Sequence, residues 1–224
     1  LPERVKDYVT EYETTLKLIT ENIDTAAMLA SEIPNLLGTG EEEKTYLVLF
    51  QNSNEIRPTG GFIGSYAVVE FQKGKIKNLA IDDIYNPDGQ IKIKDIQVAP
   101  PTVLGELLEE DRLYIRNANW DPDYTKSAET IADLYKRVAG KQVSGILAVD
   151  LNFVENLLRV TGPVYLTTYG EEINASNLYE RTQYHSEFNY EDGVSQKRAF
   201  LTVLGGKLIE KIFALSNDQM PNMF

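Results

Sequence analysis

The segment VSGILAVDLNFVENLLRVTGPVYLTTY, residues 143–169, decides the fold class of this 224-residue chain. It opens with an apolar run of strand length, VSGILAV, and DLNFVENLLRVTGP then follows with the features of a helix. Asp150 is a favourable N-cap for this helix, and Gly162 followed by Pro163 marks its C-terminus. With PVYLTTY as the next strand, the segment predicts the order strand, helix, strand.

The flanking sequence extends this alternation in both directions. YTKSAETIADLYKRVAG, residues 124–140, predicts a helix closed by Gly140, and residues 195–215 predict a last helix. Upstream, TYLVLFQ (45–51) has the continuous apolar character of a strand that is covered on both faces. FIGSYAVVEF and KIKNLAID flank a short QKGK turn and predict a hairpin. We therefore predict an α/β fold, a three-layer α/β/α sandwich, in which all these strands share one central mixed sheet.

The rest of the chain predicts one compact domain preceded by a helix. Residues 3–31 have apolar side chains at helical spacing, ended by Pro34 and Gly38, so we expect a helical segment over 1–38 and a single domain over 39–224. The region up to residue 112 is expected to be irregular, with Pro87, Pro100 and Pro101 along it and a short helix in TVLGELLEED. PDG in NPDGQ (86–90) is a common turn sequence.

Composition excludes several classes of partner. The net charge of −12 argues against nucleic acid and against docking of the domain itself on anionic lipid. The chain has no cysteine and no apolar stretch long enough to span a membrane. Because the chain begins at Leu1, we expect it to be part of a longer protein, with any membrane anchor on the N-terminal side.

The loop NEIRPTGGF, residues 54–62, is the first candidate site. Arg57 can bind a carboxylate or phosphate through two parallel hydrogen bonds, and Gly60 and Gly61 permit positive φ and a close backbone approach to a ligand. The loop follows a buried strand, where α/β sheets carry their ligand crevice. The alternative is a surface turn in which Glu55 and Arg57 pair with each other. We expect Arg57 to be held by Glu55 or by a neighbouring acid.

Acidic loops give a second candidate site. Carboxylates that follow strands or precede helices suit calcium or magnesium, which prefer oxygen ligands, and the candidates are Asp82, Asp83, Asp121 and Asp123. The alternative is local capping, for example by Asp123 at the helix after it. His185 is the only histidine, and its setting favours a surface residue.

Four segments together resemble a bacterial family known as domain of unknown function 4012. They are TYLVLFQNSNEIRPTGGFIGSYAVV, NANWDPDYTKSAETIADLY, VSGILAVDLNFVENLLRVTGPVYL and QKRAFLTVLGGKL, which span about residues 45–212 in the family's order. That family distantly resembles the LytR-CpsA-Psr proteins, membrane-anchored extracytoplasmic enzymes that transfer glycopolymers from a polyprenyl pyrophosphate carrier to the cell wall.

The resemblance implies site residues, and this chain departs from the pattern at some of them. Arg57 matches the first arginine of the LytR-CpsA-Psr site, and Lys197 with Arg198 falls on its late arginine-rich helix start. Asn52, or Gln51 in a shifted alignment, stands in place of an aspartate. Asp82 and Asp83 stand where the family carries a phosphate-binding arginine. The resemblance thus implies the fold, whereas the transferase activity does not follow from it.

Three functions remain open. The first is recognition of a cell-surface glycopolymer or its polyprenyl-linked precursor, with contacts from Asn52, Glu55, Arg57, Thr59, Gly60, Gly61, Lys197 and Arg198 and with Trp120 and Tyr124 stacking on sugar. The second is a phosphotransferase or pyrophosphatase assisted by magnesium or calcium on the four aspartates. The third is a structural surface domain. An extracytoplasmic location accompanies all three. A deep apolar tunnel would favour the polyprenyl carrier, and a shallow aromatic groove would favour free glycan.

Overall fold

The computed structural model describes residues 31–32, 34–40, 42–187 and 196–214, so all but the end of the helix predicted over 3–31 lies outside them. The chain divides into two compact units, residues 1–44 with 71–77 and residues 45–70 with 78–224. The predicted boundary at residue 38 stays a prediction. No helix among the described residues combines the length and the apolar character that a membrane span needs.

The smaller unit contains two glycine-dependent turns. Gly38 has a φ of +57°, and the amide of Thr39 donates to the carbonyl of Pro34, which is the pattern of a glycine-ended helix. Gly38 thus ends helical structure as predicted. Lys73 and Gly74, with φ values of 52° and 72°, form the two-residue connection between β2 (Phe62–Gln72) and β3 (Lys75–Asp83). The predicted hairpin is therefore confirmed.

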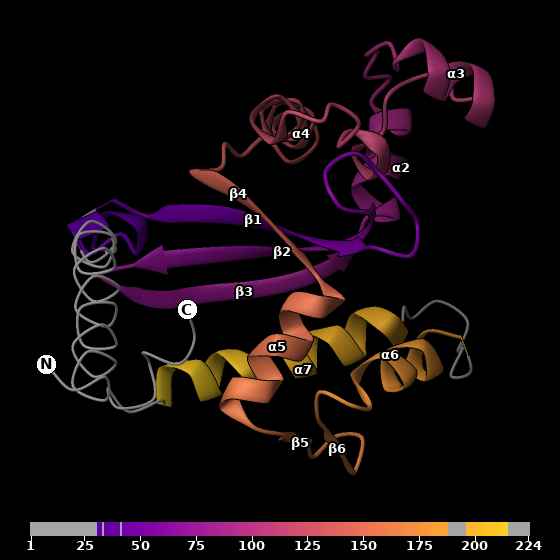
Figure 1. The fold of residues 1–224 in the computed structure, drawn as a ribbon. Coiled ribbons are helices and arrows are strands. Elements are labelled where there is room, and N and C mark those ends of the chain that lie inside the picture. The colour runs from indigo at the N-terminus through magenta and orange to yellow at the C-terminus, as the bar shows by residue number, and fades with distance from the viewer. Residues whose placement is uncertain (1–30, 33, 41, 188–195, 215–224) are drawn as a thin grey trace, which may run out of the picture. The chain divides into compact units, whose positions relative to one another are not determined.

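The central sheet has four strands in the order β3-β2-β1-β4 (Figure 1). β1 (Lys44–Asn52) pairs in parallel with β4 (Gly145–Asp150), with partners running from Tyr46 and Gly145 to Gln51 and Asp150. The sheet is mixed, as predicted, because the hairpin is antiparallel and the β1–β4 pair is parallel. β4 forms one edge of it.

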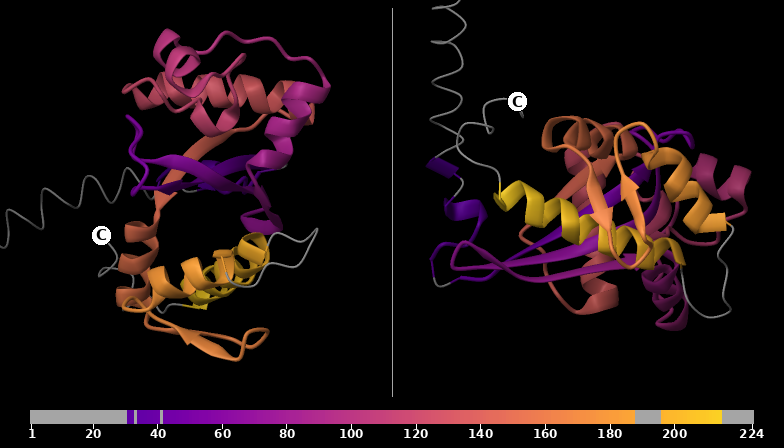
Figure 2. Two further views of the ribbon diagram at one scale, coloured as in Figure 1. Left: turned by 90° about the vertical axis from the view of Figure 1, so that its right-hand side faces the viewer. Right: turned by 90° about the horizontal axis from the view of Figure 1, so that it is seen from below.

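Helices cover both faces of this sheet, which confirms the predicted three layers (Figure 2). One layer contains α2 (Tyr85–Ile93), α3 (Thr102–Leu108), the 3-10 helix η1 (Ile115–Asn117) and α4 (Tyr124–Ala139). This layer packs on the sheet in one continuous apolar core, which includes Leu47, Leu49, Ile63, Ile91, Ile131 and Leu134. β1 supplies its part by alternation: Thr45, Leu47, Leu49 and Gln51 are buried, whereas the residues between them are partly exposed.

The cap residues of α4 are those that the sequence predicted. The Asp123 side chain accepts a hydrogen bond from the Thr125 amide, and Gly140 ends the helix at a φ of +69°. The predicted turn at NPDGQ is wrong, because Pro87, Asp88 and Gly89 lie inside α2. Pro87 is tolerated there, because the amides of the first helical turn have no partner within the helix.

The second layer contains α5 (Leu151–Thr161), α6 (Leu178–Glu187) and α7 (Gln196–Ala214). Asp150 caps α5 by accepting from the Phe153 amide, as predicted. PVYLTTY is wrongly predicted as part of the central sheet: β5 (Val164–Leu166) pairs with β6 (Glu171–Ile173) in a separate two-stranded sheet. Leu166 and Ile173 are fully buried in the apolar cluster of this layer, and that burial explains the apolar run.

His185 of α6 is buried, with 4% of its surface exposed, so its predicted surface position is wrong. Its ring stacks on Phe200 of α7, and its Nε2 contacts the Glu171 carboxylate, which also pairs with Arg181. The histidine therefore joins α6, α7 and β6.

Candidate functional site

The NEIRPTGGF loop leaves the sheet where the two parallel strands end. Gln51 and Asp150 are register partners in the last pair of β1 and β4, and the loop follows directly after Asn52. From this point β1 connects to β2 on one side, whereas β4 lies on the other. Open α/β sheets bind ligands at such a divergence, at the carboxyl ends of parallel strands.

The two glycines hold the loop against the end of β1. Gly60 has a φ of +127°, and a Cβ on Gly61 would lie 2.3 Å from the carbonyl oxygen of Asn52. The Asn119 amide donates to the Gly61 carbonyl over 2.7 Å, and the Thr59 hydroxyl donates to the Asn119 carbonyl. The predicted close approach is therefore real, but it is made to the backbone of the protein itself.

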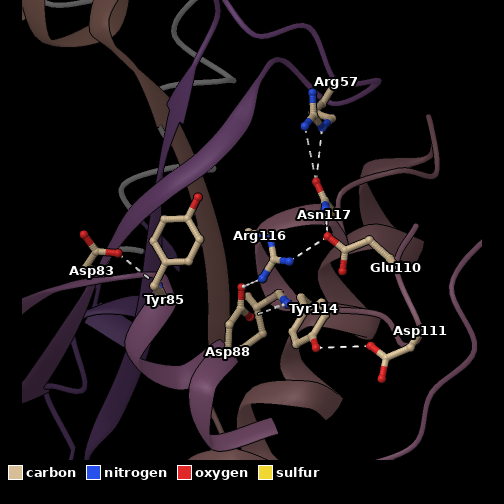
Figure 3. Close-up of polar contacts among 10 residues, drawn as sticks. Arg57, Asp83, Tyr85, Asp88, Glu110, Asp111, Tyr114, Arg116 and Asn117 are labelled. Carbon is tan, nitrogen blue, oxygen red and sulfur yellow. Dashed lines mark hydrogen bonds and ion pairs between the residues drawn. The ribbon is translucent and has the colours of Figure 1, made fainter. Parts of the chain in front are cut away.

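Arg57 is held by an amide (Figure 3). Its Nε and Nη2 donate to the Asn117 side-chain oxygen over 3.4 and 3.3 Å, and its Nη1 donates to the Ile56 carbonyl over 2.9 Å. The guanidinium also lies 5.4 Å from the centre of the Phe62 ring. The expected pairing with Glu55 is wrong. Glu55 instead accepts from the Asn52 amide nitrogen over 3.0 Å.

Asn117 is itself anchored in a network of charges (Figure 3). Its amide nitrogen donates to Glu110, which also pairs with Arg116 over 2.6 Å. Arg116 pairs in turn with Asp88 over 3.0 Å, and Asp88 accepts from the Ile115 amide over 2.7 Å. Burial raises the pKa of Asp88 to about 6, although Arg116 opposes that shift. The network fixes η1, and with it the oxygen that holds Arg57.

Arg57 differs from the other arginines whose side chains the structure describes. Five form ion pairs with carboxylates: Arg112, Arg116, Arg137, Arg159 and Arg181. Within the same described part of the chain, no carboxylate lies within ion-pairing distance of Arg57. In a protein of net charge −12, an arginine with no carboxylate partner among the described residues is a candidate contact for an anion.

An apolar cavity lies between the sheet and the second helical layer. Its volume is about 130 Å³, roughly ten times the space that one buried water requires. Val149 and Phe50 line it from the sheet, and most of the remaining apolar lining comes from Leu151, Val154, Leu178, Leu201, Leu204 and Leu208. Polar groups at the strand ends and on α6 also line it, namely Gln51, Asn52, Asp150, Tyr179, Thr182 and Gln183. Asn52 is thus the predicted site residue that borders the cavity.

A second hollow, which we call the β4 groove, follows the edge of β4 and has a volume of about 460 Å³. Three predicted site residues, Thr59, Gly60 and Tyr124, line it. The Tyr124 hydroxyl donates to the Ile146 carbonyl over 3.1 Å, and burial raises the pKa of Tyr124. The tyrosine therefore remains a neutral donor at ordinary pH.

The other predicted ligand contacts do not line either hollow, or their side chains are not described by the structure. Trp120 packs against the core of the first helical layer, so its ring is only partly available for stacking. Lys197 and Arg198 lie in the first turn of α7, where the structure does not describe their side chains. Arg57 lines neither the cavity nor the β4 groove.

The predicted convergence of aspartates on a metal is not found: among the described residues, no three acidic or histidine side chains group as a metal ion would need. The two neighbouring pairs, Asp82 with Asp83 and Asp121 with Asp123, instead form hydrogen bonds within their own turns. Asp82 accepts from the Asp83 amide and from Asn86, and Asp83 accepts from the Tyr85 amide. Asp121 accepts from the amide of Asp123, which caps α4. Binding of magnesium or calcium stays a prediction.

Several residues of the site were not singled out from the sequence. Asn117 stands in the NANWDPDY block, where its spacing gave no sign that it reaches Arg57. Gln51 and Asp150 were named from the sequence only as an alignment alternative and as a helix cap, and they lie side by side because β1 and β4 pair in register. Phe153 and Tyr179 sit on helices whose orientation the pattern leaves open.

Solved structures share this architecture, a mixed four-stranded sheet between two helical layers. A Streptococcus agalactiae structure, protein gbs0355, matches with a TM-score of 0.51 at 14% identity, over 86% of this chain and 67% of that one. Two further structures, Lin1025 of Listeria innocua and TagV of B. subtilis, match with TM-scores of 0.49 and 0.48. Both are 12% identical over 82% of this chain and 70% of theirs.

Sequence comparison gives the family. The profile of the protein family of unknown function DUF4012 matches residues 41–186, which is more than half of the chain, so the chain belongs to this family. No curated protein is a significant sequence match.

Proposed function

We propose that this domain binds the polyprenyl-pyrophosphate-linked precursor of a cell-surface glycopolymer, outside the cytoplasmic membrane. The coarser proposal is a LytR-CpsA-Psr-like domain with a role in cell-wall glycopolymer handling. The fold and the family support it. The finer proposal rests on one observation above all, the apolar cavity beside the strand ends.

The cavity suits an isoprenoid chain. Leucine and valine side chains from α5, α6 and α7 supply most of its aliphatic lining, and polar side chains gather where β1 and β4 end. An apolar chain gains about 0.8 kcal/mol for each methylene group that it removes from water. The neutral polar groups Asn52, Tyr179 and Gln183 can meet a polar head. Asp150 lines the same end of the cavity and would repel a phosphate close to it, so the proposed phosphate lies on the side of the Arg57 loop.

Arg57 does not line the cavity, and it is the proposed contact for a phosphate that extends out of the cavity toward the loop. It lies on the loop that follows Asn52. The side-chain oxygen of Asn117 holds its guanidinium group without neutralising the charge. A charge-assisted hydrogen bond to phosphate contributes about 1.5–3 kcal/mol. The loss of Arg57 should therefore weaken binding by about tenfold or more.

The cavity can be tested with one substitution and one matched control. Geranylgeranyl pyrophosphate serves as the probe, and its affinity is measured by calorimetry. Leu204→Trp fills the cavity from α7 and should weaken binding by at least about tenfold. Leu107→Trp makes the same change on an α3 residue that is 75% exposed, and it should leave affinity unchanged. If the Leu204 variant keeps its fold, as judged by thermal melting, and still binds like the wild type, the proposal is wrong.

Arg57→Ala tests the head group. It should weaken binding of geranylgeranyl pyrophosphate while leaving geranylgeraniol, which lacks phosphate, unaffected. Arg137→Ala is the control, because Arg137 is half-exposed on α4 and pairs with Asp133. Equal losses for the phosphorylated and unphosphorylated probes would remove Arg57 from the proposed contact.

A further inference from the structure

The β4 groove carries chemistry that the proposed lipid cavity does not use. Its floor is a run of consecutive residues on an edge strand, from Ile146 to Asp150. Around this floor stand Gln51 from β1, Thr59 and Gly60 from the loop, Tyr124 from α4 and Phe153 from α5. Four separate segments of the chain thus converge on it.

Apolar side chains in the groove are exposed. Phe153 is 55% exposed, Leu147 53% and Tyr124 38%. The Phe153 and Tyr124 rings therefore offer surface that the core does not require. Gln51, Thr59 and Asp150 add hydrogen-bonding groups to the same hollow. This combination suits a ligand with an apolar C–H face and a rim of hydroxyl groups.

The charge of the lining disfavours an anion. Asp150 is the one ionisable acid that lines the groove, and no lysine or arginine lines it among the residues described. The Asp150 carboxylate accepts from the Phe153 amide over 2.8 Å and from the Asn152 side chain over 2.9 Å, and it retains capacity for further donors. Hydroxyl groups can donate to it, whereas a phosphate would be repelled.

The groove is also poorly suited to a pairing strand. The Tyr124 hydroxyl already bonds the Ile146 carbonyl, so an added strand that uses this acceptor would have to displace it. Edge strands that are blocked in this way resist pairing with other chains. A small saccharide makes no such demand on the backbone.

We propose that the β4 groove is a binding subsite for neutral sugar residues. Tyr124 and Phe153 pack against the apolar face of the sugar, and Gln51 and Asp150 bond its hydroxyl groups. This inference rests on the proposed function, because Gln51, Val149 and Asp150 line both the cavity and the groove. The sugar therefore lies beside the end of the lipid cavity. It can belong to the lipid-linked precursor or to a free polymer.

The test uses the 224-residue chain and three probes: chitotetraose as a neutral oligosaccharide, poly(glycerol phosphate) as an anionic polymer, and geranylgeranyl pyrophosphate for the cavity. Chitotetraose should bind and should shift the nuclear magnetic resonance signals of Tyr124 and Phe153. Phe153→Ala should weaken its binding by about tenfold. Tyr165→Ala removes a ring that is 57% exposed on β5, outside the groove, and should leave binding unchanged.

Three results would overturn the inference. They are the absence of chitotetraose binding, binding that does not shift the groove signals, and preference for the anionic polymer. Self-association that Leu147→Lys abolishes would do the same, because it would make the groove an interface between copies. If chitotetraose binds in the groove while geranylgeranyl pyrophosphate fails to bind anywhere, the sugar subsite stands and the proposed lipid function falls.

A joint-binding experiment distinguishes the two sources of the sugar. If it belongs to the precursor, geranylgeranyl pyrophosphate and chitotetraose should bind together, and a probe that joins the two chemistries should bind at least about tenfold more tightly than either. If it belongs to a free polymer, the joined probe should show no gain. Both outcomes keep the subsite and assign its ligand.

Discussion

The two helical layers cover the central sheet in different ways. Side chains of β1 and β2 interdigitate with α2 and α4 in one continuous core. On the other face, α5, α6 and α7 form an apolar cluster with β5 and β6 that includes no residue of the central sheet. The cavity lies between that cluster and the sheet. A layer that packs mainly on itself can be stable and still leave space for a ligand.

The same contrast extends to buried charge. The first layer buries Asp88 to 2% exposure and neutralises it with Arg116, which also binds Glu110. The second layer holds Glu171, with 17% of its side chain exposed, between Arg181 and His185. The first network supports the loop residue Arg57 through Asn117. The second joins α6 and α7 to the β5–β6 pair, away from the ends of β1 and β4.

The largest expected effect comes from breaking the first network. Arg116→Met leaves the Asp88 carboxylate buried without its partner and should lower the free energy of unfolding by about 3–5 kcal/mol. Arg181→Met in the second layer leaves a more accessible acid and should cost about 1–2 kcal/mol. Urea denaturation of both variants measures the difference, and equal losses would erase the contrast between the layers.

Truncation of apolar side chains should also differ between the layers. Ile131 of α4 is 1% exposed in the continuous core, so Ile131→Ala should cost about 4 kcal/mol. Leu204 is 3% exposed but borders the cavity, where it has fewer neighbours to lose, so Leu204→Ala should cost about 2 kcal/mol. Equilibrium denaturation distinguishes them. A larger loss at Leu204 would mean that the second layer is packed as tightly as the first.

The buried acid of the first layer predicts a pH dependence. The pKa of Asp88 is about 6 in the folded state, against 3.8 in an unperturbed chain. Between these values the folded state holds a proton that the unfolded state has released, so stability falls as pH rises from about 4 to about 6. This contribution is roughly 3 kcal/mol. Asp88→Asn should flatten that part of the profile, and melting temperatures across this range test it.

Enlarging side chains should give the smallest and most telling difference. Leu134→Phe in the continuous core should destabilise by about 1–3 kcal/mol, because close-packed neighbours must move. Leu204→Phe projects into the cavity and should change stability by less than about 1 kcal/mol. A matched pair of thermal melts suffices, and a strong loss at Leu204 would contradict the cavity.

The sequence predicted those parts of the fold that local chemistry determines. Asp123, Gly140 and Asp150 cap their helices as their residue types indicated, because capping depends on neighbours within a few positions. The helix α2 was missed because Pro87 and Gly89 favour turns, and tertiary burial of Ile91 overrides that preference. The strand β5 was assigned to the wrong sheet, because an apolar run indicates that a strand is buried but does not determine which strand it pairs with.

The candidate site was predicted only in outline. The loop, the glycines and Arg57 were identified from residue types and from resemblance. That Asn117 holds Arg57 depends on contacts across 60 positions of the chain, which no local pattern encodes. The aspartates look like metal ligands in sequence because the same oxygen atoms serve to cap turns and helices.

The cavity also bears on how the domain responds to hydrostatic pressure. Pressure favours the state of smaller molar volume, and unfolding eliminates internal space that side chains do not fill. The cavity of about 130 Å³ is partly open to solvent, so only the part that water does not fill adds to the decrease in volume on unfolding. A chain lodged beside Leu204 fills that space, so the liganded domain should resist pressure better than the empty one.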